Sequence, residues 1–378
     1  MISVIEVIPA LNMGGAETMV KDYCLLIDRQ QFDISVIVLT EHTGTPIEKE
    51  LEESGVRVIY LGEQLFNNPH IGIVKRAIRR IHRYYSFRKA VLSLNPDVIH
   101  IHLQIGKYMR VLPLKKMRVK LFLTVHNVTE RFFSKDKGDR VKNIEYKEVN
   151  RLIHGYGLTL ISLHDGLNKE LRDLFDTDRV ITVNNGIRLD RFNPELYNRT
   201  IERDRIGIKG DFLVIGHVGS MHPQKNHDLI LDIFEELHKN IPNSQLLLIG
   251  KGELKEHIMK RINDLGIGKN VTILSDRDDV PQLMACMDVF LFPSRWEGFG
   301  NVLIEAQCMG LPCVVSDAIS DETRITDMVH VVSLDAPIKS WIGEIKKTIN
   351  GQRGKYATKK KIDYDMAACI KRLETIYR

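Results

Sequence analysis

The sequence has few cysteines and no long hydrophobic run. Its 378 residues include only five cysteines, which are scattered along the chain and form no CxxC pair of the kind that binds zinc. We therefore expect reduced, buried thiols of a cytoplasmic protein. The apolar run in the N-terminal stretch MISVIEVIPALNMGGAE has no basic region before it and is too short for a signal peptide or a membrane span. The sequence predicts neither export nor a transmembrane helix.

Low-complexity tracts and short-period repeats are also missing. Hydrophobic residues make up 43% and charged residues 27% of the chain, which is ordinary for a soluble globular protein and does not indicate disorder. A chain of this length exceeds the size at which single cores stop growing, so we expect two domains. The formal net charge of +5 is compatible with anionic ligands or an anionic surface and does not require nucleic acid.

Short β-branched runs alternate with amphipathic stretches throughout the chain, which predicts parallel sheets with crossover helices. The strands expected in the first half are SVIEVIP, DISVIVLT, VRVIYL, PDVIHIHL, VKLFLTVHN, LTLISL and RVITVNN. Those expected in the second half are FLVIGHVGS, QLLLIGKG, VTIL, DVFLFP, PCVVSD and VHVVSL. We predict two doubly wound α/β domains, 1–189 and 190–361, followed by a C-terminal helix, 362–378. Ligands should bind at the carboxyl ends of the strands.

Two loops of the first half are candidates for ligand binding. Gly14 and Gly15 form a turn between a strand and a helix, where exposed amides suit a phosphate or a sugar. This turn matches neither the GxGxxG fingerprint nor the lysine-containing P-loop, and a purely structural turn is an equal alternative. His126 lies at the carboxyl end of the expected strand VKLFLTVHN and so faces the cleft that we expect where the strands of the two domains end. A single histidine is, however, more often structural.

A second pair of histidines resembles a metal pair. His100 and His102 lie two residues apart and so on one face of a strand. No carboxylate or cysteine set nearby completes a site, so we favour packing or cleft lining over metal binding.

In the second half, Lys225 follows a strand and precedes a helix, where a mobile cation neutralises a phosphate. The alternative is a solvated lysine. Gly250 and Gly252 in GKGE would let a base or a ribose approach the backbone, but this pattern is common.

The stretch RWEGFGNVLIEA places Glu297 and Glu305 on either side of a glycine turn. Paired acids can indicate glycoside hydrolysis, but the glycines interrupt the segment, so the two acids need not address one bond. The amides of Phe299, Gly300 and Asn301, with Asn301 as the expected N-cap, form a helix N-terminus that can receive a phosphate. Glu305 could equally be an ordinary exposed helix residue.

Together these stretches resemble the family 4 glycosyltransferases, retaining enzymes with the GT-B fold, over nearly the whole chain. The most specific element is EGFGNVLIE, and the supporting elements are GGAE, TVHN, NNGI and VGSMHPQKN. The chain looks most like bacterial members that build capsular polysaccharide or exopolysaccharide. The resemblance implies two Rossmann-like domains facing across a central cleft, with the last helix returning to the first domain.

The resemblance also implies a reaction and its residues. A metal-independent hexosyltransferase would move a sugar from a nucleotide diphosphate sugar, most commonly a UDP-sugar, to a glycan or lipid-linked acceptor. Glu305 would bind the ribose and Glu297 the donor sugar, while Lys225 and the amides after Glu297 would stabilise the departing diphosphate. His126 would contact the sugar, and the GGAE turn would close over the donor phosphates or border the acceptor. No cofactor is expected.

One position departs from the family pattern. Ser220 stands where the family usually has an arginine, and His222 or Arg295 are the candidates to replace that cation. Because of this departure, an alternative function is that of a non-catalytic partner, which would bind a nucleotide sugar for another transferase. A sugar-nucleotide epimerase or a phosphorylase on the same two-domain plan is a further alternative.

Residues 64–96 contain no acidic residue and include a basic, amphipathic segment. Such a helix fits an anionic membrane surface, although a solvated helix face is the simpler alternative and nucleic acid lacks any recognisable binding motif. We expect a cytoplasmic protein that associates peripherally with the inner face of the cell membrane and binds no nucleic acid. The membrane-surface candidates are Lys75, Arg76, Arg79, Arg80 and Arg83.

Overall fold

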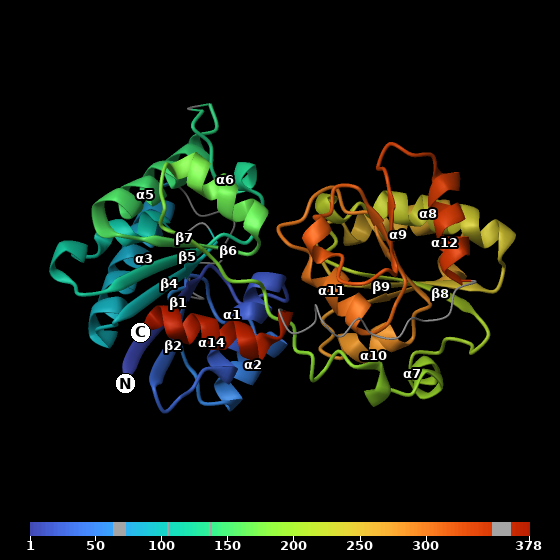
Figure 1. Ribbon diagram of the computed structural model, residues 1–378, viewed down its shortest axis with the longest axis horizontal. Helices are drawn as coiled ribbons and strands as arrows, with labels where there is room; N and C mark the ends of the chain where they lie inside the picture. The colour runs from blue at the N-terminus through green and yellow to red at the C-terminus, as the bar shows by residue number, and fades with distance from the viewer. Residues whose placement is uncertain (63–72, 104–105, 137, 350–363) are drawn as a thin grey trace. The chain divides into compact units, whose positions relative to one another are not determined.

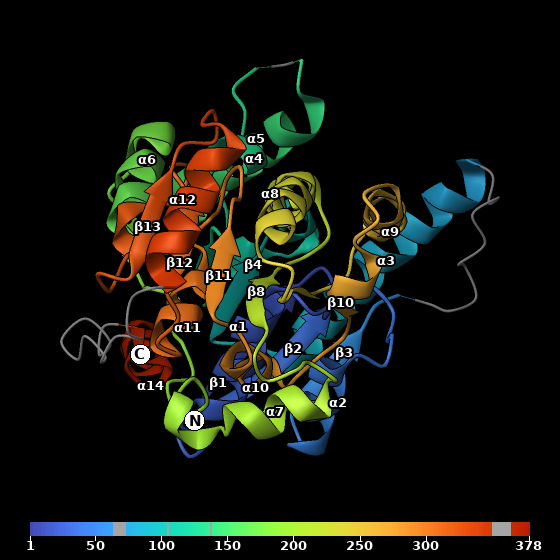
Figure 2. The same ribbon diagram turned by 90° about the vertical axis from the view of Figure 1, so that its right-hand side faces the viewer.

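The computed structural model describes residues 1–62, 73–103, 106–136, 138–349 and 364–378, without the side chains of residues 73–79. The chain forms two compact units (Figures 1 and 2). The N-terminal unit consists of Met1–Gly186 together with Ala367–Arg378, and the C-terminal unit is Ile187–Met366.

The N-terminal unit contains a seven-stranded parallel sheet in the order β3-β2-β1-β4-β5-β6-β7. Its strands are β1 (Ile2–Ile8), β2 (Phe32–Val38), β3 (Arg57–Tyr60), β4 (Val98–His102), β5 (Lys120–Thr124), β6 (Thr159–Ser162) and β7 (Val180–Thr182). Its helices are α1 (Gly15–Leu26), α2 (Pro46–Glu53), α3 (Ile73–Leu94), α4 (Thr129–Phe132), α5 (Arg140–Tyr156), α6 (Asp165–Phe175) and α14 (Met366–Tyr377). Two 3-10 helices, η2 (Gly106–Val111) and η3 (Leu114–Lys116), follow β4.

The C-terminal unit contains a six-stranded parallel sheet in the order β10-β9-β8-β11-β12-β13. Its strands are β8 (Leu213–Val218), β9 (Ser244–Ile249), β10 (Val271–Leu274), β11 (Val289–Phe292), β12 (Cys313–Ser316) and β13 (Val329–Val332). Its helices are α7 (Arg199–Arg205), α8 (His227–Asn240), α9 (Lys255–Asp264), α10 (Val280–Ala285), α11 (Asn301–Cys308) and α12 (Ile338–Ile349). Short 3-10 helices are η4 (Pro194–Leu196), η5 (Pro223–Lys225), η6 (Gly268–Asn270) and η7 (Asp321–Thr323).

Both sheets reverse their strand order once, between β1 and β4 and between β8 and β11. This is the arrangement of doubly wound sheets, in which the loops after the strands on either side of the reversal form the binding crevice. The predicted α/β fold class of two Rossmann-like units is therefore confirmed.

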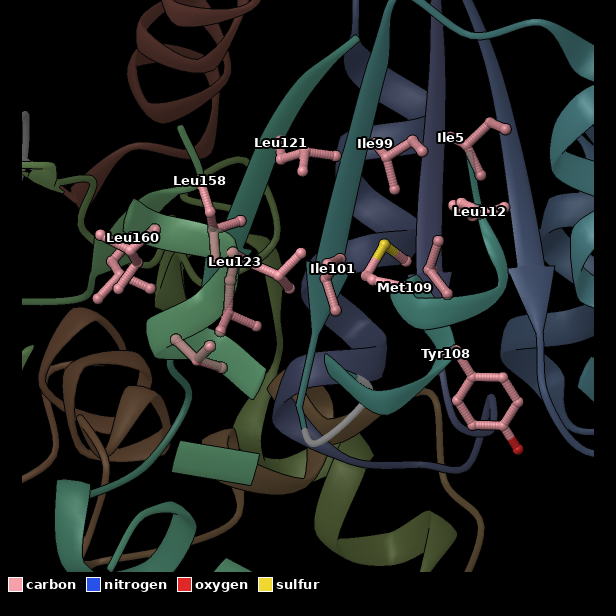
Figure 3. Close-up of a cluster of buried hydrophobic side chains, with 14 of the residues drawn as sticks. Ile5, Ile99, Ile101, Tyr108, Met109, Leu112, Leu121, Leu123, Leu158 and Leu160 are labelled. Atoms are coloured by element: carbon pink, nitrogen blue, oxygen red, sulfur yellow. The ribbon is translucent and has the colours of Figure 1, made fainter. Parts of the chain in front are cut away.

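The N-terminal sheet presents different side chains to its two faces, because successive residues of a strand point in opposite directions. Ile5, Ile99 and Leu121 belong to a buried apolar cluster with Met109 and Leu158 (Figure 3). That cluster also contains side chains of α3, α5 and α6. The intervening residues of the central strands include the polar Glu6 and His100, which contact Tyr377 of α14.

The C-terminal helix α14 belongs to the N-terminal unit although it follows the C-terminal unit in the chain. The ring of Tyr377 packs edge-on against Phe32 at 6.3 Å between centroids, and Glu374 accepts a hydrogen bond of 2.8 Å from the amide of Asp28. Just before α14, Asp365 forms a bridge with Ile187, so the two ends of the C-terminal unit are joined.

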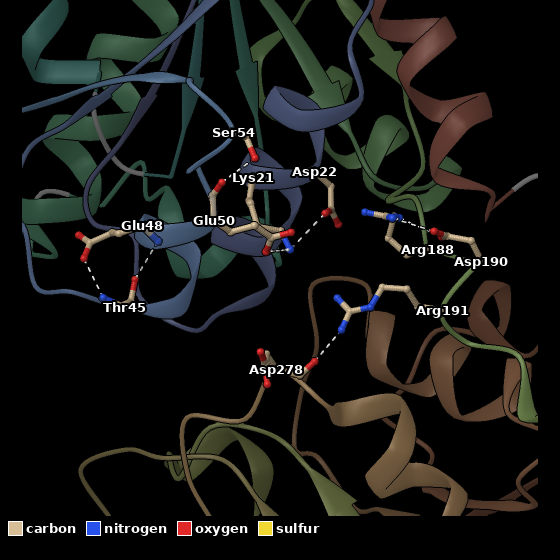
Figure 4. A network of polar contacts seen from close by, with 10 residues as sticks. All are labelled: Lys21, Asp22, Thr45, Glu48, Glu50, Ser54, Arg188, Asp190, Arg191 and Asp278. Carbon is tan, nitrogen blue, oxygen red and sulfur yellow. Dashed lines mark hydrogen bonds and ion pairs between the residues drawn. The ribbon is translucent and has the colours of Figure 1, made fainter. Parts of the chain in front are cut away.

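Polar contacts fix the start of α2 and a loop of the C-terminal unit (Figure 4). Thr45 caps α2 by accepting from the amide of Glu48, whose carboxylate accepts from the amide of Thr45 in return. In the C-terminal unit, the guanidinium of Arg191 donates to the carbonyl of Asp278 at 2.6 Å, which anchors the segment that follows Ile187.

All five cysteines lie in the described part of the chain and are buried, in agreement with the prediction of buried thiols. Within the described ranges, no helix combines the length and the apolar character needed to cross a bilayer.

Candidate functional site

The main candidate site of the C-terminal unit lies where β8, β9 and β11 end. These three strands are neighbours at the reversal of the sheet, so the loops after them lie at one edge. The loop after β8 carries Ser220, His222 and Lys225, and the loop after β11 carries Glu297. The structure thus brings together the residues predicted for the diphosphate and the sugar.

Lys225 and Glu297 form a close ion pair. The ammonium Nζ of Lys225 lies 2.6 Å from Oε1 of Glu297, and the two side chains are only 12% and 8% exposed. Gln224 donates to the other carboxylate oxygen at 2.9 Å. The ammonium also lies 4.8 Å from the centre of the Phe292 ring, a cation–π contact. The pair is neutral as a whole, and its cation is held at the end of the central strands.

The loops after β8 and β11 are tied to each other. Asn226 adopts a left-handed conformation with φ of 57°. Its side-chain amide Nδ2 donates to the carbonyl of Pro293 at 3.2 Å. The backbone amide of Arg295 donates to the carbonyl of Gln224 at 2.8 Å, and its guanidinium donates to Oδ1 of Asn226 at 3.0 Å. These contacts hold the exposed Arg295 beside the Lys225 loop, where a replacement cation was predicted.

The helix α11 begins differently from the prediction. Gly300, with φ of 88°, is the N-cap, and Asn301 is the first helical residue. The prediction that Asn301 caps the helix is wrong, because the left-handed cap conformation favours glycine. Phe299 is buried with its ring 5.7 Å from that of Tyr364, and the half-buried Glu305 lies one turn into the helix. The N-terminus of α11 carries the positive end of the helix dipole, which suits an anion.

Gly250 and Gly252 are required by packing within the protein. A Cβ at Gly250 would lie 2.0 Å from the carbonyl oxygen of Gly219, and one at Gly252 would lie 2.4 Å from that of Met221. The amide of Met221 donates to the carbonyl of Lys251 at 2.9 Å. The two glycines therefore allow the loop after β9 to support the turn that carries the exposed Ser220.

His222 and His217 differ in environment. His222 is exposed and lies 3.3 Å from Glu253. His217, which we did not predict, is fully buried in β8, and burial holds its pKa well below the usual range. Its Nδ1 donates to the carbonyl of Leu291 at 2.9 Å. The signal that identifies His217 is a polar residue in the otherwise apolar strand FLVIGHV.

In the N-terminal unit, Gly14 is the N-cap of α1 and Gly15 its first residue. The carboxylate of Glu17 folds back over this turn, since a Cβ at Gly14 would lie 2.3 Å from its Oε2. Burial raises the pKa of Glu17 to about 7, and a hydrogen bond from its own amide opposes the rise only in part. We did not predict a role for Glu17, although it is the acid of the GGAE motif.

His126 lies at the end of a buried polar cluster. Nε2 of His102 is 2.6 Å from Oε2 of Glu6, and Nδ1 of His102 is 2.9 Å from Nε2 of His126. Nδ1 of His100 lies 3.2 Å from the same oxygen of Glu6. The expectation that no carboxylate accompanies His100 and His102 is wrong, because Glu6 pairs with His100 across the neighbouring strands β1 and β4. Sequence spacing could not reveal a partner from another strand.

The donor set of Glu6, His100 and His102 has the composition of a zinc site. Each of these residues is fully buried, and hydrogen bonds within the cluster account for the atoms that would bind a metal. The geometry therefore favours a polar network over a metal site.

The predicted membrane helix is α3, and the side chains of Lys75, Arg76 and Arg79 lie outside the described residues. Arg80 is exposed and Arg83 is half-buried. Ile81 is 67% exposed, and Val141 of α5 is 69% exposed. Arg80 and Val141 take part in lining a pocket of about 470 Å³, which sequence reasoning did not predict. It is lined by Arg80, Tyr84, Lys107, Arg110, Val111, Val141, Ile144 and Glu145.

Comparison with known proteins agrees with this picture. The family model "Glycosyltransferase Family 4" matches residues 13–191, and "Glycosyl transferases group 1" matches residues 198–358. EpsF of Bacillus subtilis, which is named as a glycosyltransferase, is 28% identical over 93% of this chain and 89% of its own length. The capsular polysaccharide biosynthesis glycosyltransferase CapH of Staphylococcus aureus is 23% identical over 93% of this chain and 92% of its own.

Among solved structures, Anabaena Alr3699/HepE in complex with UDP and glucose superposes with a TM-score of 0.72 at 17% identity, over 100% of this chain and 99% of that one. The glycosyltransferase WaaG of lipopolysaccharide biosynthesis gives 0.71 at 17% identity, over 99% and 96%. These likenesses support the shared fold, and the two family models between them match most of the sequence. The chain therefore belongs to the glycosyltransferases that combine a family 4 N-terminal domain with a group 1 C-terminal domain.

Proposed function

We propose that this glycosyltransferase moves a hexose from a UDP-sugar to a glycan or lipid-linked sugar acceptor during the synthesis of a surface polysaccharide. The reaction retains the anomeric configuration and needs no metal. The observation that carries the proposal is the buried pair of Lys225 and Glu297 at the carboxyl edge of the central strands, beside the N-terminus of α11.

The names of relatives support the choice of substrates. An Escherichia coli relative, 28% identical over 77% of this chain, is named as a galactosyltransferase that uses UDP-Gal and a diphosphoundecaprenol-linked GlcNAc. CapH acts in capsular polysaccharide biosynthesis according to its name. The structure of HepE contains UDP and glucose.

The donor would be held by groups already placed at the edge of the sheet. Without donor, the ammonium of Lys225 is neutralised by Glu297. A bound diphosphate would compete for that cation, and the released carboxylate of Glu297 would then accept hydrogen bonds from hydroxyls of the sugar. The first amides of α11 would receive a phosphate oxygen, and Glu305 would accept from the ribose hydroxyls.

The chemistry requires charge stabilisation more than acid catalysis. The bond between the anomeric carbon and the diphosphate oxygen breaks, and the acceptor oxygen forms its bond to that carbon from the same face. The acceptor proton passes to the departing diphosphate. Lys225 and the dipole of α11 stabilise the negative charge that develops on the leaving group. Arg295, whose guanidinium donates to Asn226, would supply the cation that Ser220 cannot.

The N-terminal unit would meet a lipid-linked acceptor at a membrane surface. Ile81 and Tyr85 of α3 and Val141 of α5 are exposed, and Arg80 and Lys107 line the described pocket together with Val141. Apolar and basic side chains together favour the interface of an anionic bilayer.

A thermal-shift screen with a panel of nucleotide sugars tests the donor, because a ligand that binds only the folded state raises the melting temperature. Mass spectrometry of the products with lipid-linked acceptors then separates transfer from isomerisation, and the anomeric linkage shows retention. Full turnover in EDTA supports metal independence. Binding of a donor without transfer to any acceptor would favour a non-catalytic partner, and conversion of the donor into an epimer would contradict the proposal.

A further inference from the structure

A chain of polar side chains crosses one face of the sheet in the N-terminal unit. It runs from Glu6 of β1 through His102 of β4 to His126 after β5, with successive contacts of 2.6 Å and 2.9 Å. Glu6 and His102 are fully buried, whereas His126 is partly exposed. This row of side chains therefore connects the buried carboxylate of Glu6 with the imidazole of His126, which can contact a ligand.

The charge of Glu6 determines the direction of every hydrogen bond along this chain. Burial alone would raise its pKa, but the charges of and hydrogen bonds with His100 and His102 hold it well below the usual range. An ionised carboxylate only accepts, so Nε2 of His102 must carry the proton. Burial lowers the pKa of His102 to about 4, so at neutral pH its ring holds one proton and its Nδ1 is an acceptor.

The proton positions of His126 follow from those of His102. Because Nδ1 of His102 accepts, Nε2 of His126 must donate to it. Burial is the main reason why the pKa of His126 lies well below its usual range, and the nearby histidines lower it further. The ring is therefore neutral. Its Nδ1 is then an unprotonated acceptor. Among the residues that the structure describes, none hydrogen-bonds to this atom.

A second contact holds the starting point of the chain in place. The hydroxyl of Tyr377, on α14, donates to Oε1 of Glu6 at 3.0 Å and lies 2.6 Å from Nδ1 of His100. This contact uses the other oxygen of the carboxylate. It supports Glu6 without taking part in the path to His126, which makes Tyr377 a control position.

We infer that Glu6 and His102 are positioning residues that fix the tautomer of His126, so that its bare Nδ1 accepts a hydrogen bond from a hydroxyl of a bound sugar. The inference rests on the proposed function, which supplies a sugar as the ligand. A neutral acceptor suits this place, because an imidazolium would repel the positive charge that develops on the sugar ring.

The tautomer can be measured without any donor. In protein labelled with ¹⁵N-histidine, the signals of His126 are those lost in His126→Gln, and they should show a protonated Nε2 and a bare Nδ1. In Glu6→Gln, the side-chain amide can donate as well as accept, so the proton positions of His102 and His126 should become mixed. Tyr377→Phe should leave the wild-type pattern unchanged.

Turnover supplies the second measurement. Glu6→Gln should lower kcat about tenfold, the effect of losing one neutral hydrogen bond, and Tyr377→Phe should remain close to wild type. A protonated Nδ1 in wild-type His126, or equal turnover of the two variants, would overturn the inference. If Glu6→Gln does not fold, His102→Gln replaces it, because the introduced amide also donates or accepts while the contact of Glu6 with Tyr377 remains. Failure of the wild type to bind any nucleotide sugar would instead count against the proposed function.

Discussion

The ammonium of Lys225 is paired with the carboxylate of Glu297 at 2.6 Å, and both side chains are nearly buried. This contact joins the residue proposed for the leaving diphosphate to the residue proposed for the donor sugar. The pair contributes to folding, and under the proposed function the binding of a donor would exchange it for ligand contacts.

Replacing Lys225 should affect stability and turnover separately. Lys225→Met leaves Glu297 buried without its cation and should lower the free energy of unfolding by about 2–4 kcal/mol. Turnover should fall about 100-fold or more, as for loss of one preorganised donor to a developing anion. The double variant Lys225→Met/Glu297→Gln should recover most of the stability but none of the turnover. Urea unfolding and initial rates measure the two effects.

The surface pair of Lys239 and Glu235 on α8 is the matched control. Lys239→Met removes one cation from the surface and should leave the free energy of unfolding close to that of the wild type. If the double variant at Lys225 and Glu297 regained turnover together with stability, Lys225 would have only a structural role.

Gly250 should tolerate no side chain. At its φ of 148°, a Cβ would approach the carbonyl oxygen of Gly219 to 2.0 Å. Gly250→Ala should therefore destabilise the protein by about 2 kcal/mol or more and weaken donor binding, because the turn that carries Ser220 must move. Gly343→Ala in α12 meets no atom within 4 Å and should stabilise the helix by up to about 1 kcal/mol. Thermal unfolding and donor titration compare the two variants, and equal stability of both would contradict this account.

Glu17 should make stability depend on pH near neutrality. Its pKa is about 7 in the folded protein against 4.5 for the ordinary carboxyl. Between these values the folded state binds more protons than the unfolded state, so this group's contribution to stability is present at low pH and is lost as the pH rises through 7. Relative to wild type, Glu17→Gln should gain up to about 3 kcal/mol between pH 4.5 and pH 8. Glu53→Gln on the exposed face of α2 controls for the loss of a carboxylate. Parallel stability curves for wild type and Glu17→Gln would refute the assignment.

The strand pattern was predictable because each strand of a doubly wound sheet is a short apolar run that the sequence shows directly. The loop motifs were also visible, since Lys225, Gly250 and Glu297 stand directly after such runs. Strand order at the reversal then places those loops at one edge. Local signals could therefore identify the candidate site without any knowledge of contacts.

Contacts between distant segments were not predictable. Glu6 and His102 are 96 residues apart in the chain, and Tyr377 reaches Glu6 from the last helix. The cap of α11 was mistaken for a related reason: side-chain preference favoured Asn301, whereas the turn requires the left-handed conformation of Gly300. The basic residues of the sequence indicated α3 as the membrane-binding helix. The fold showed in addition that side chains of α5 line the same pocket as side chains of α3.

Exposed apolar side chains of α3 and α5 should control binding to membranes. Ile81 is 67% and Val141 is 69% exposed, and they accompany basic side chains that attract anionic lipid. Ile81→Ser/Val141→Ser should lower the partition coefficient on vesicles containing phosphatidylglycerol about 30-fold, because each of the two large side chains contributes about 1 kcal/mol or more when it enters the interface. Met259 of α9 is 49% exposed in the C-terminal unit, so Met259→Ser should leave binding unchanged. Sedimentation at low and high salt measures both contributions. Equal loss from the Met259 variant, or no binding of the wild type at low salt, would show that this surface does not meet a membrane.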